Sequence, residues 1–366
     1  MGTMLQVYDL GLVDFEGHEG CNEILNLTRP DVVRAVHDAY FEVGVDCVET
    51  NTFGANWANL AEYGIEDRIE ELARAGAVIA RESADAWATP DRPRWVLGSV
   101  GPGTKLPTLG HAPYAMLRDA YELQVRGLVD GGADAVLVET AQDLLQAKAA
   151  IVGAKRAMAT SGVDLPLIVT VTVETTGTML LGSEIGAALT AIEPLGVDLI
   201  GLNCATGPTE MSEHLRFLAR HARAGLACLP NAGLPVLGRH GASYPLTPLE
   251  LADAHDTFTR EYGLALVGGC CGTTPEHLRL VVERVRGRDV PPRRPRPEPG
   301  TASLYQSVAF RQDTSYLSIG ERTNANGSKA FRDAMLAERW NDCVEIARAQ
   351  TRDGAHLLDV CIDYVG

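Results

Sequence analysis

The sequence has no long apolar run and few basic residues. No stretch reaches the about 18 or more apolar residues of a transmembrane helix, and the amino terminus lacks the charged-then-apolar pattern of a secretory signal. Only 32 Lys and Arg stand against 48 Asp and Glu, which gives a formal net charge of −16. Because such a chain repels nucleic acid and anionic lipid, we expect neither nucleic acid nor membrane among its partners.

Cysteine is scarce too, and its spacing is not that of a secreted disulfide-rich domain. We therefore expect a cytoplasmic protein whose cysteines are core thiols or metal ligands. The nine histidines do not cluster, which argues against a histidine-rich metal site. The eight cysteines are Cys21, Cys47, Cys204, Cys228, Cys270, Cys271, Cys343 and Cys361.

One local pattern recurs: a helical segment, a glycine, a small residue, an aspartate and then a β-branched apolar run. It occurs at Gly44-Val45-Asp46, Gly132-Ala133-Asp134 and Gly196-Val197-Asp198. Glycine after a helix, followed by an apolar strand, is typical of a parallel sheet. Further strands are expected at Trp95–Val100, Leu167–Val173, Gly225–Leu229 and Leu264–Val267, and helices near 30–43, 66–85, 113–130, 142–159, 184–194, 209–223, 248–262 and 275–286.

Seven strands alternating with helices over roughly 285 residues predict an α/β fold, a (β/α)8 TIM barrel. The remaining strand would be the first one and would precede Met1, so we expect an amino-terminal truncation. We predict three segments: a barrel over 1–287, a Pro/Arg-rich linker over 288–314, and the incomplete start of a second βα unit over 315–366. In that last segment we expect a strand at Tyr316–Ile319, a helix over 328–353 and another strand after Gly354.

Two strands are expected to end in cysteine. Cys270 and Cys271 follow the last apolar run within a glycine-rich frame, and Cys204 follows another apolar run. Neighbouring cysteines rarely form a disulfide with each other, whereas adjacent thiolates suit a soft metal. Three sulfurs with no obvious fourth thiol predict a zinc site with one open position, as in catalytic zinc sites. The alternative is that these cysteines are buried core thiols.

Polar residues end other strands at the same edge, where barrel enzymes build their active sites. Glu139 follows an entirely apolar strand, so its carboxylate needs a partner unless it is solvated or caps a helix. The side-chain oxygen of Asn231 could complete the zinc shell when substrate is absent, although a turn asparagine is an equal alternative.

Residues 1–287 resemble the homocysteine-binding module of the cobalamin-dependent methionine synthases. The resemblance is carried by Gly201-Leu202-Asn203-Cys204, Gly268-Gly269-Cys270-Cys271-Gly272-Thr273, Glu49-Thr50-Asn51-Thr52-Phe53 and Pro230-Asn231-Ala232-Gly233. The later run Ile319-Gly320-Glu321-Arg322-Thr323-Asn324 is similar to the start of the folate-binding (pterin-binding) barrel that follows this module in that family.

The resemblance implies that Zn2+ held by Cys204, Cys270 and Cys271 binds homocysteine as a thiolate. It also implies that Glu139 accepts the ammonium group of homocysteine and that Gly2 and Thr3 offer backbone amides to its carboxylate. The methyl donor would be methylcobalamin, bound by a domain outside this chain, and the product methionine. The partners would be the methylcobalamin-carrying and folate-binding domains of the full-length enzyme.

Two other functions remain open at this point. A stand-alone methyltransferase that uses betaine or S-methylmethionine would share the three cysteines, but it would need neither the linker nor a second barrel. A non-catalytic barrel could instead use the thiols to bind zinc or sense oxidants.

Overall fold

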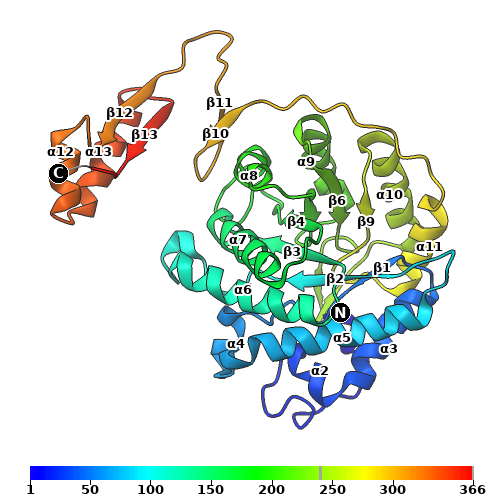
Figure 1. Cartoon of the computed structure of the whole chain (residues 1–366). Coiled ribbons are helices and arrows are strands. Elements are labelled where there is room, and N and C mark those ends of the chain that lie inside the picture. Colours follow the sequence, from blue (N-terminus) through cyan, green and yellow to red (C-terminus); the bar gives the residue numbers. More distant parts are fainter. Residues whose placement is uncertain (239–240, 365–366) are drawn as a thin grey trace. The chain divides into compact units, whose positions relative to one another are not determined.

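Seven parallel strands form one curled sheet with helices along its outer side (Figure 1). The computed structural model describes residues 1–238 and 241–364. Neighbouring strands follow chain order, β1-β2-β3-β4-β5-β6-β9, as expected for successive βα units. The strands are β1 Cys47–Glu49, β2 Trp95–Val100, β3 Ala135–Ala141, β4 Leu167–Val171, β5 Leu199–Asn203, β6 Gly225–Leu229 and β9 Leu266–Val267.

The predicted α/β barrel architecture is confirmed, as a curled sheet that stays open on one side. In the described part of the chain, the edge strands β1 and β9 each pair with only one neighbour, β2 and β6 respectively. Side chains on the inner face of the sheet form one layer of core, because alternate residues of a strand point to the same side. This cluster contains Leu97, Ala135, Leu137, Ile168 and Ala227, with Cys47, Leu199 and Leu266 packed against it.

Helices follow the strands near the predicted positions, and local signals explain where they begin and end. The Asp143 side chain caps α7 by accepting the amides of Leu145 and Gln146, and Gly162 ends that helix in a left-handed conformation. The helices are α3 Pro30–Glu42, α5 Ile69–Trp87, α6 Tyr114–Asp130, α7 Leu144–Ser161, α8 Ile185–Ile192, α9 Pro208–His221, α10 Pro248–Tyr262 and α11 Pro275–Val285.

Several short elements were not predicted, because they are too short to show a period. They are α1 Gly2–Leu5, α2 Leu25–Thr28, α4 Trp57–Tyr63, the hairpin of β7 Val236–Gly238 with β8 Gly241–Ser243, and single 3₁₀ turns at Asn22–Ile24, Glu66–Arg68, Pro107–Leu109 and Glu193–Leu195.

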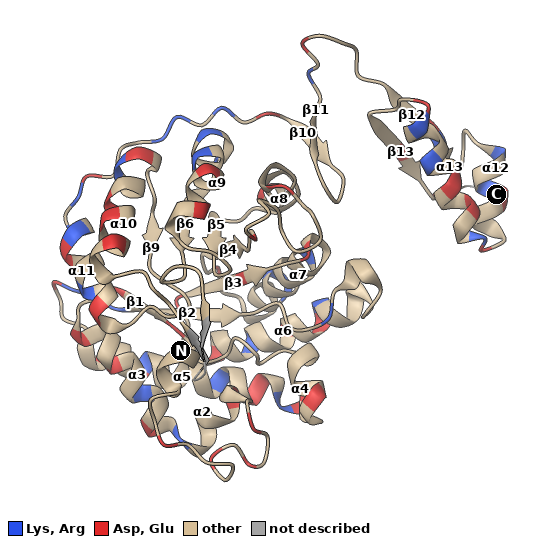
Figure 2. Ribbon diagram, turned by 180° about the vertical axis from the view of Figure 1, so that it is seen from behind, with Lys and Arg blue, Asp and Glu red and all other residues tan. Residues whose placement is uncertain are grey.

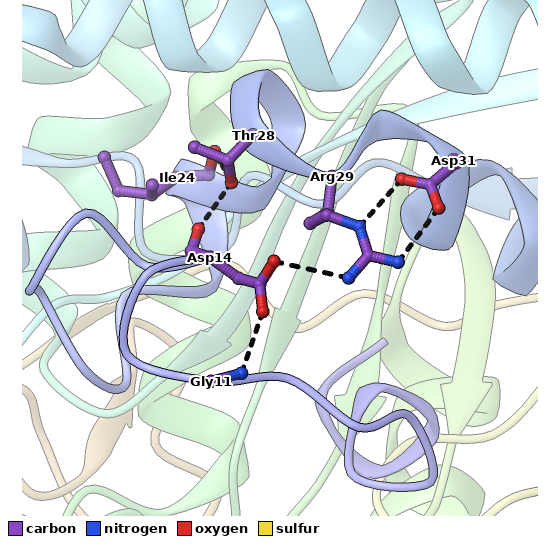
Figure 3. A network of polar contacts seen from close by, with 6 residues as sticks. All are labelled: Gly11, Asp14, Ile24, Thr28, Arg29 and Asp31. Atoms are coloured by element: carbon purple, nitrogen blue, oxygen red, sulfur yellow. Dashed lines mark hydrogen bonds and ion pairs between the residues drawn. The ribbon is translucent and has the colours of Figure 1, made fainter.

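The segment between α1 and α2 is held in place by one arginine (Figure 3). The Arg29 guanidinium donates to both oxygens of Asp31 at 3.0 Å and also pairs with Asp14 at 3.3 Å. The other Asp14 oxygen accepts the Gly11 amide at 2.8 Å, and the Asp14 carbonyl accepts the Thr28 hydroxyl at 2.5 Å. These contacts tie the loop around Asp14 to the end of α2 and the start of α3.

Charged residues lie mainly on the outer helices, whereas the strands of the sheet are mainly uncharged (Figure 2). Two glutamates that do lie on these strands, Glu49 and Glu139, therefore stand out. Among the described residues, no helix combines the length and apolarity required to cross a lipid bilayer.

The chain divides into two compact units, Met1–Pro297 and Glu298–Gly366. In the second unit, β12 Ile319–Asn324 pairs in parallel with β13 Leu357–Cys361, with α12 Lys329–Leu336 and α13 Trp340–Arg352 between them in the chain. Large apolar side chains stay exposed on this unit, as expected for a βα fragment with too little core: Ile319, Leu336, Trp340, Val344, Val360 and Ile362.

Three expectations for this region were inaccurate. The strand expected at Tyr316–Ile319 begins only at Ile319. The helix expected over 328–353 is two helices, interrupted where Glu338 takes a positive φ of 55°. The predicted 288–314 linker contains an antiparallel hairpin of β10 Gly300–Ala302 and β11 Ser307–Ala309, whose turn is closed by the Ser303 hydroxyl accepting the amides of Tyr305 and Gln306.

Candidate functional site

The three cysteines predicted as metal ligands lie together at the carboxyl ends of the strands. The Cys271 sulfur is 4.0 Å from the Cys204 sulfur and 4.0 Å from the Cys270 sulfur, and all three sulfurs lie within 4.8 Å of one another. Sulfurs bound to one tetrahedral zinc at about 2.3 Å would lie about 3.8 Å apart. The donor set therefore fits a zinc ion after small side-chain adjustments.

The chain segment after β6 holds the two cysteine loops against each other. The Cys270 amide donates to the Pro230 carbonyl at 2.7 Å, and the Ala232 amide donates to the Cys271 carbonyl at 2.9 Å. On the other side, the Cys204 amide donates to the Leu229 carbonyl at 3.1 Å. Because β6 lies between β5 and β9, its end bridges loops that are far apart in the sequence.

The backbone around the sulfurs is unusual. Cys204 and Ala205 have positive φ values of 58° and 56°, which are uncommon for residues with a side chain and occur where the surroundings enforce them. Gly272 has a φ of 76°, and a β-carbon there would lie 2.3 Å from the Tyr244 ring. Glycine is therefore required at this position for two independent reasons.

A buried histidine supports the loop that carries Cys270. Its Nε2 lies 2.7 Å from the Gly268 carbonyl, and burial lowers the pKa of His255 to about 4. The imidazole is neutral at physiological pH and donates from Nε2, since a carbonyl can only accept. His255 thus anchors the strand end from α10.

The sulfurs share one hydrogen-bonded cluster, which favours a thiolate at Cys271. Hydrogen bonds from Cys204, then Cys270, and a further one from Tyr244 lower the pKa of Cys271. The contacts with Cys204 and Cys271, together with burial, raise the pKa of Cys270. A preformed negative charge among soft donors is suited to a metal cation.

Glu139 is buried near these sulfurs and has polar partners. The Ser99 hydroxyl donates to Oε1 at 2.5 Å, and the Asn203 side-chain amide donates to Oε2 at 3.3 Å. Burial, followed by the charge of Glu49, raises the pKa of Glu139 well above its ordinary range. A carboxylate in this setting is stabilised by a cation.

Asn203 is a buried hub that the sequence analysis did not assign to the site. Its Oδ1 accepts the Thr140 amide and the Thr170 hydroxyl, each at 2.7 Å, and its Nδ2 donates to the Thr140 hydroxyl at 2.8 Å as well as to Glu139. Thr140 itself has a positive φ of 58°, so Asn203 holds a strained residue next to the candidate carboxylate. The sequence did carry one signal for this role. Asn203 is a polar residue two positions after Gly201 in an apolar strand, and this spacing places both residues on the inner face.

Replacing Asn203 with alanine should lower the free energy of unfolding by about 2–4 kcal/mol, because several buried polar groups would lose partners at once. Urea titration followed by circular dichroism measures this effect. The matched control is Asn341→Ala at an exposed position of α13, which should stay within about 0.5 kcal/mol of the parent. Equal effects of the two changes would contradict the role of Asn203 as a hub.

A cavity of about 770 Å³ opens beside the cysteines, and both edge strands contribute to its walls. It is lined by the three cysteines, Glu139, Gly2 and Thr3, but not by Asn231. Gly2 and Thr3 form the first turn of α1, and the Thr3 hydroxyl accepts the Gly272 amide at 3.4 Å. The structure thus brings together six of the seven predicted site residues around one cavity.

Asn231 lies next to the site, where its side chain contacts the Cys271 loop. Its side-chain Oδ1 accepts the backbone amide of Cys271 at 3.0 Å, and its backbone amide donates to the Thr206 carbonyl at 3.1 Å. The side chain therefore supports the Cys271 loop, and its oxygen would have to release that amide before it could bind a metal. Besides Asn203, the sequence analysis also missed Ser99, Tyr244 and Glu49 as residues near the site.

Comparison with known proteins adds family information to this geometry. The sequence family described as "Homocysteine S-methyltransferase" matches residues 1–285, and the one described as "Pterin binding enzyme" matches residues 320–366. The methionine synthase of Mycobacterium tuberculosis is 64% identical over 366 residues, and that of Mycobacterium leprae is 62% identical over 371 residues. All of this chain is covered in both alignments, but it spans only 31% of each relative.

Solved structures agree on the fold. The homocysteine methyltransferase MmuM from Escherichia coli in its metallated form superimposes with a TM-score of 0.60 at 21% identity, covering 78% of this chain and 93% of that one. Its apo form gives a TM-score of 0.55 at 20% identity, covering 77% and 98%.

Proposed function

Since the chain belongs to the homocysteine S-methyltransferase family, we propose that it binds zinc through Cys204, Cys270 and Cys271 and activates homocysteine for methylation at sulfur. The observation that carries this proposal is the group of three sulfurs within 4.8 Å at the edge of a cavity that also contains a buried carboxylate. A bound zinc ion would stabilise the thiolate form of homocysteine, whose free thiol has a pKa of about 8.5 and is mostly protonated at neutral pH.

The residues of the chain hold the amino acid end of the substrate. Glu139 accepts the ammonium group, and its orientation is set by Ser99 and Asn203. Gly2 and Thr3, whose backbone amides start α1, bind the carboxylate; both residues line the cavity. The side-chain oxygen of Asn231 keeps Cys271 in place by accepting its backbone amide. Glu139 and the amides bind both ends of the amino acid zwitterion, which leaves the thiol directed toward the cysteines.

We further propose methylcobalamin as the methyl donor, carried by a domain outside this chain, with methionine as the product. Support comes from the pterin-binding match over residues 320–366 and from the greater length of the methionine synthase relatives. The folate-binding and cobalamin-carrying domains of a full-length enzyme would be the partners. All eight cysteines are free thiols, which favours a reducing compartment such as the cytoplasm.

The purified, reduced chain should bind one zinc ion, because only one group of three metal-binding side chains occurs among the described residues. Elemental analysis gives the stoichiometry, and X-ray absorption should count three protein sulfurs per zinc. Cys204→Ser should lose most of the metal, whereas Cys343→Ser, a change in the second unit, should keep it. Full zinc content after Cys204→Ser would contradict the proposed ligand set.

A homocysteine methylation assay with different methyl donors distinguishes this function from a stand-alone methyltransferase and from a non-catalytic thiol barrel. The zinc-loaded chain should methylate homocysteine with free methylcobalamin and should stop when a chelator removes zinc. Faster turnover with betaine or S-methylmethionine would instead support a stand-alone methyltransferase. Zinc binding without turnover on any donor, with reversible loss of thiols under oxidant, would support the non-catalytic thiol barrel.

A further inference from the structure

We propose that Glu49 is a second carboxylate for the ammonium group of the substrate, acting together with Glu139. This inference rests on the proposed function, because it assumes that the cavity receives an amino acid with a thiol. It adds a residue that neither the sequence analysis nor the family comparison assigned. It also explains why a carboxylate lies on the first strand of a mainly uncharged sheet (Figure 2).

The position of Glu49 follows from strand geometry. Glu49 is the last residue of β1 and is paired in register with Leu97 of β2. Cys47, two residues earlier, packs against the inner core cluster, so Glu49 also points inward. Ser99, two residues beyond Leu97 on the same face, donates to Glu139 on β3. Glu49, Ser99 and Glu139 thus occupy three neighbouring strands, and all three line the cavity.

Glu49 differs from Glu139 in having no partner. Within residues 1–238 and 241–364, its carboxylate forms no hydrogen bond or ion pair with another side chain. Burial raises its pKa, and the charge of Cys271 raises it further. The charge of Glu49 also raises the pKa of Glu139, so the two carboxylates act on each other within one cavity.

The chemistry of an α-ammonium explains the use of a second carboxylate. The ammonium has three N–H donors, whereas each oxygen of Glu139 already accepts one hydrogen bond from the protein and keeps one further lone pair. The oxygens of Glu49 can accept the remaining donor. Two carboxylates that line the same cavity repel each other when no cation is present, and an ammonium bound by both removes that repulsion. The pair therefore selects thiols that carry an amino group over thiols that lack one.

Two ligands test this selectivity in the zinc-loaded chain: homocysteine, and 4-mercaptobutanoate, which lacks only the amino group. Glu49→Gln should weaken homocysteine binding by about 10- to 100-fold, as expected for the loss of a charge-assisted hydrogen bond. Binding of 4-mercaptobutanoate should change by less than about twofold, since the lost contact is specific to the ammonium. Glu49→Asp should restore part of the homocysteine affinity.

The matched control is Glu174→Gln, a partly buried glutamate beyond the end of β4 that does not line the cavity. It should leave both affinities unchanged. Without ligand, Glu49→Gln should keep or raise the melting temperature, because it removes a repulsive, unpaired charge. A lower melting temperature would indicate that the Glu49 carboxylate already has a stabilising partner within the protein and would overturn the proposal.

The outcomes also separate this inference from the proposed function. If the parent chain binds both thiols through zinc but Glu49→Gln loses no affinity for homocysteine, Glu49 is not an ammonium ligand and the proposed function stands. If the parent chain binds neither thiol in the presence of zinc, the proposed function fails and this inference fails with it.

Discussion

Replacing Cys271 with alanine should abolish zinc-dependent methylation while leaving the fold nearly as stable as before. Cys271 is the central sulfur of the cluster, at 4.0 Å from each of the other two, and it is the thiol whose pKa is lowered. Structural sites with four ligands bind zinc with a free energy of about 10–16 kcal/mol. The loss of one thiolate should therefore lower the affinity for zinc by at least on the order of 100-fold. Elemental analysis and a homocysteine methylation assay measure both effects.

The cost to stability should be small, about 1 kcal/mol or less, because Cys271 lies in a partly exposed loop outside the packed interior of the barrel. Cys228→Ala is the opposite case. Cys228 is fully buried and packs on Met211, so this change should cost about 1–2 kcal/mol and leave zinc in place. If Cys271→Ala kept zinc and activity while Cys228→Ala lost them, the wrong thiols would have been assigned to the metal.

The cysteine cluster could be predicted from sequence because parallel strands end at a common edge. Once Cys204 and Cys270-Cys271 are recognised as following apolar runs, the topology alone brings them to the same side of the sheet. The long helices were predictable for a similar reason, since most show an amphipathic period, and α6, α7 and α10 end at a glycine.

The polar support of the site could not be predicted in the same way. Asn203 acts through Thr140 and Thr170 on neighbouring strands, and these contacts depend on register between strands. Asn231 was assigned by its residue type, but the structure uses its oxygen for a backbone amide of a distant loop. Glu49 was part of a quoted motif, yet only the open cavity and the absence of a partner distinguish it from a solvated carboxylate.

Glu139→Gln should leave zinc bound but weaken homocysteine binding by about 1.5–3 kcal/mol, the usual contribution of a charge-assisted hydrogen bond. The change keeps the size of the side chain, and the Ser99 hydroxyl can still donate to the remaining oxygen. Calorimetry with homocysteine, alongside metal analysis, separates substrate binding from metal binding. An empty metal site in Glu139→Gln would mean that Glu139 supports the cysteines rather than the substrate.

Stability without ligand gives an independent check on the charge of Glu139. Burial and the neighbouring Glu49 raise its pKa in the folded chain well above the value of about 4.3 for an unfolded glutamate. The folded chain therefore holds this proton more tightly than the unfolded chain, so the contribution of Glu139 to stability is present below pH 4.3 or so and is lost as pH rises through the folded pKa. Glutamine does not titrate. The difference between the melting temperature of Glu139→Gln and that of the parent should therefore shift in favour of the variant as pH rises from about 5 to about 8. A constant packing cost of the substitution cancels in this comparison. A gap that stayed constant would mean that Glu139 is not a buried carboxylate waiting for a cation, which would remove the electrostatic basis for ammonium recognition in this cavity.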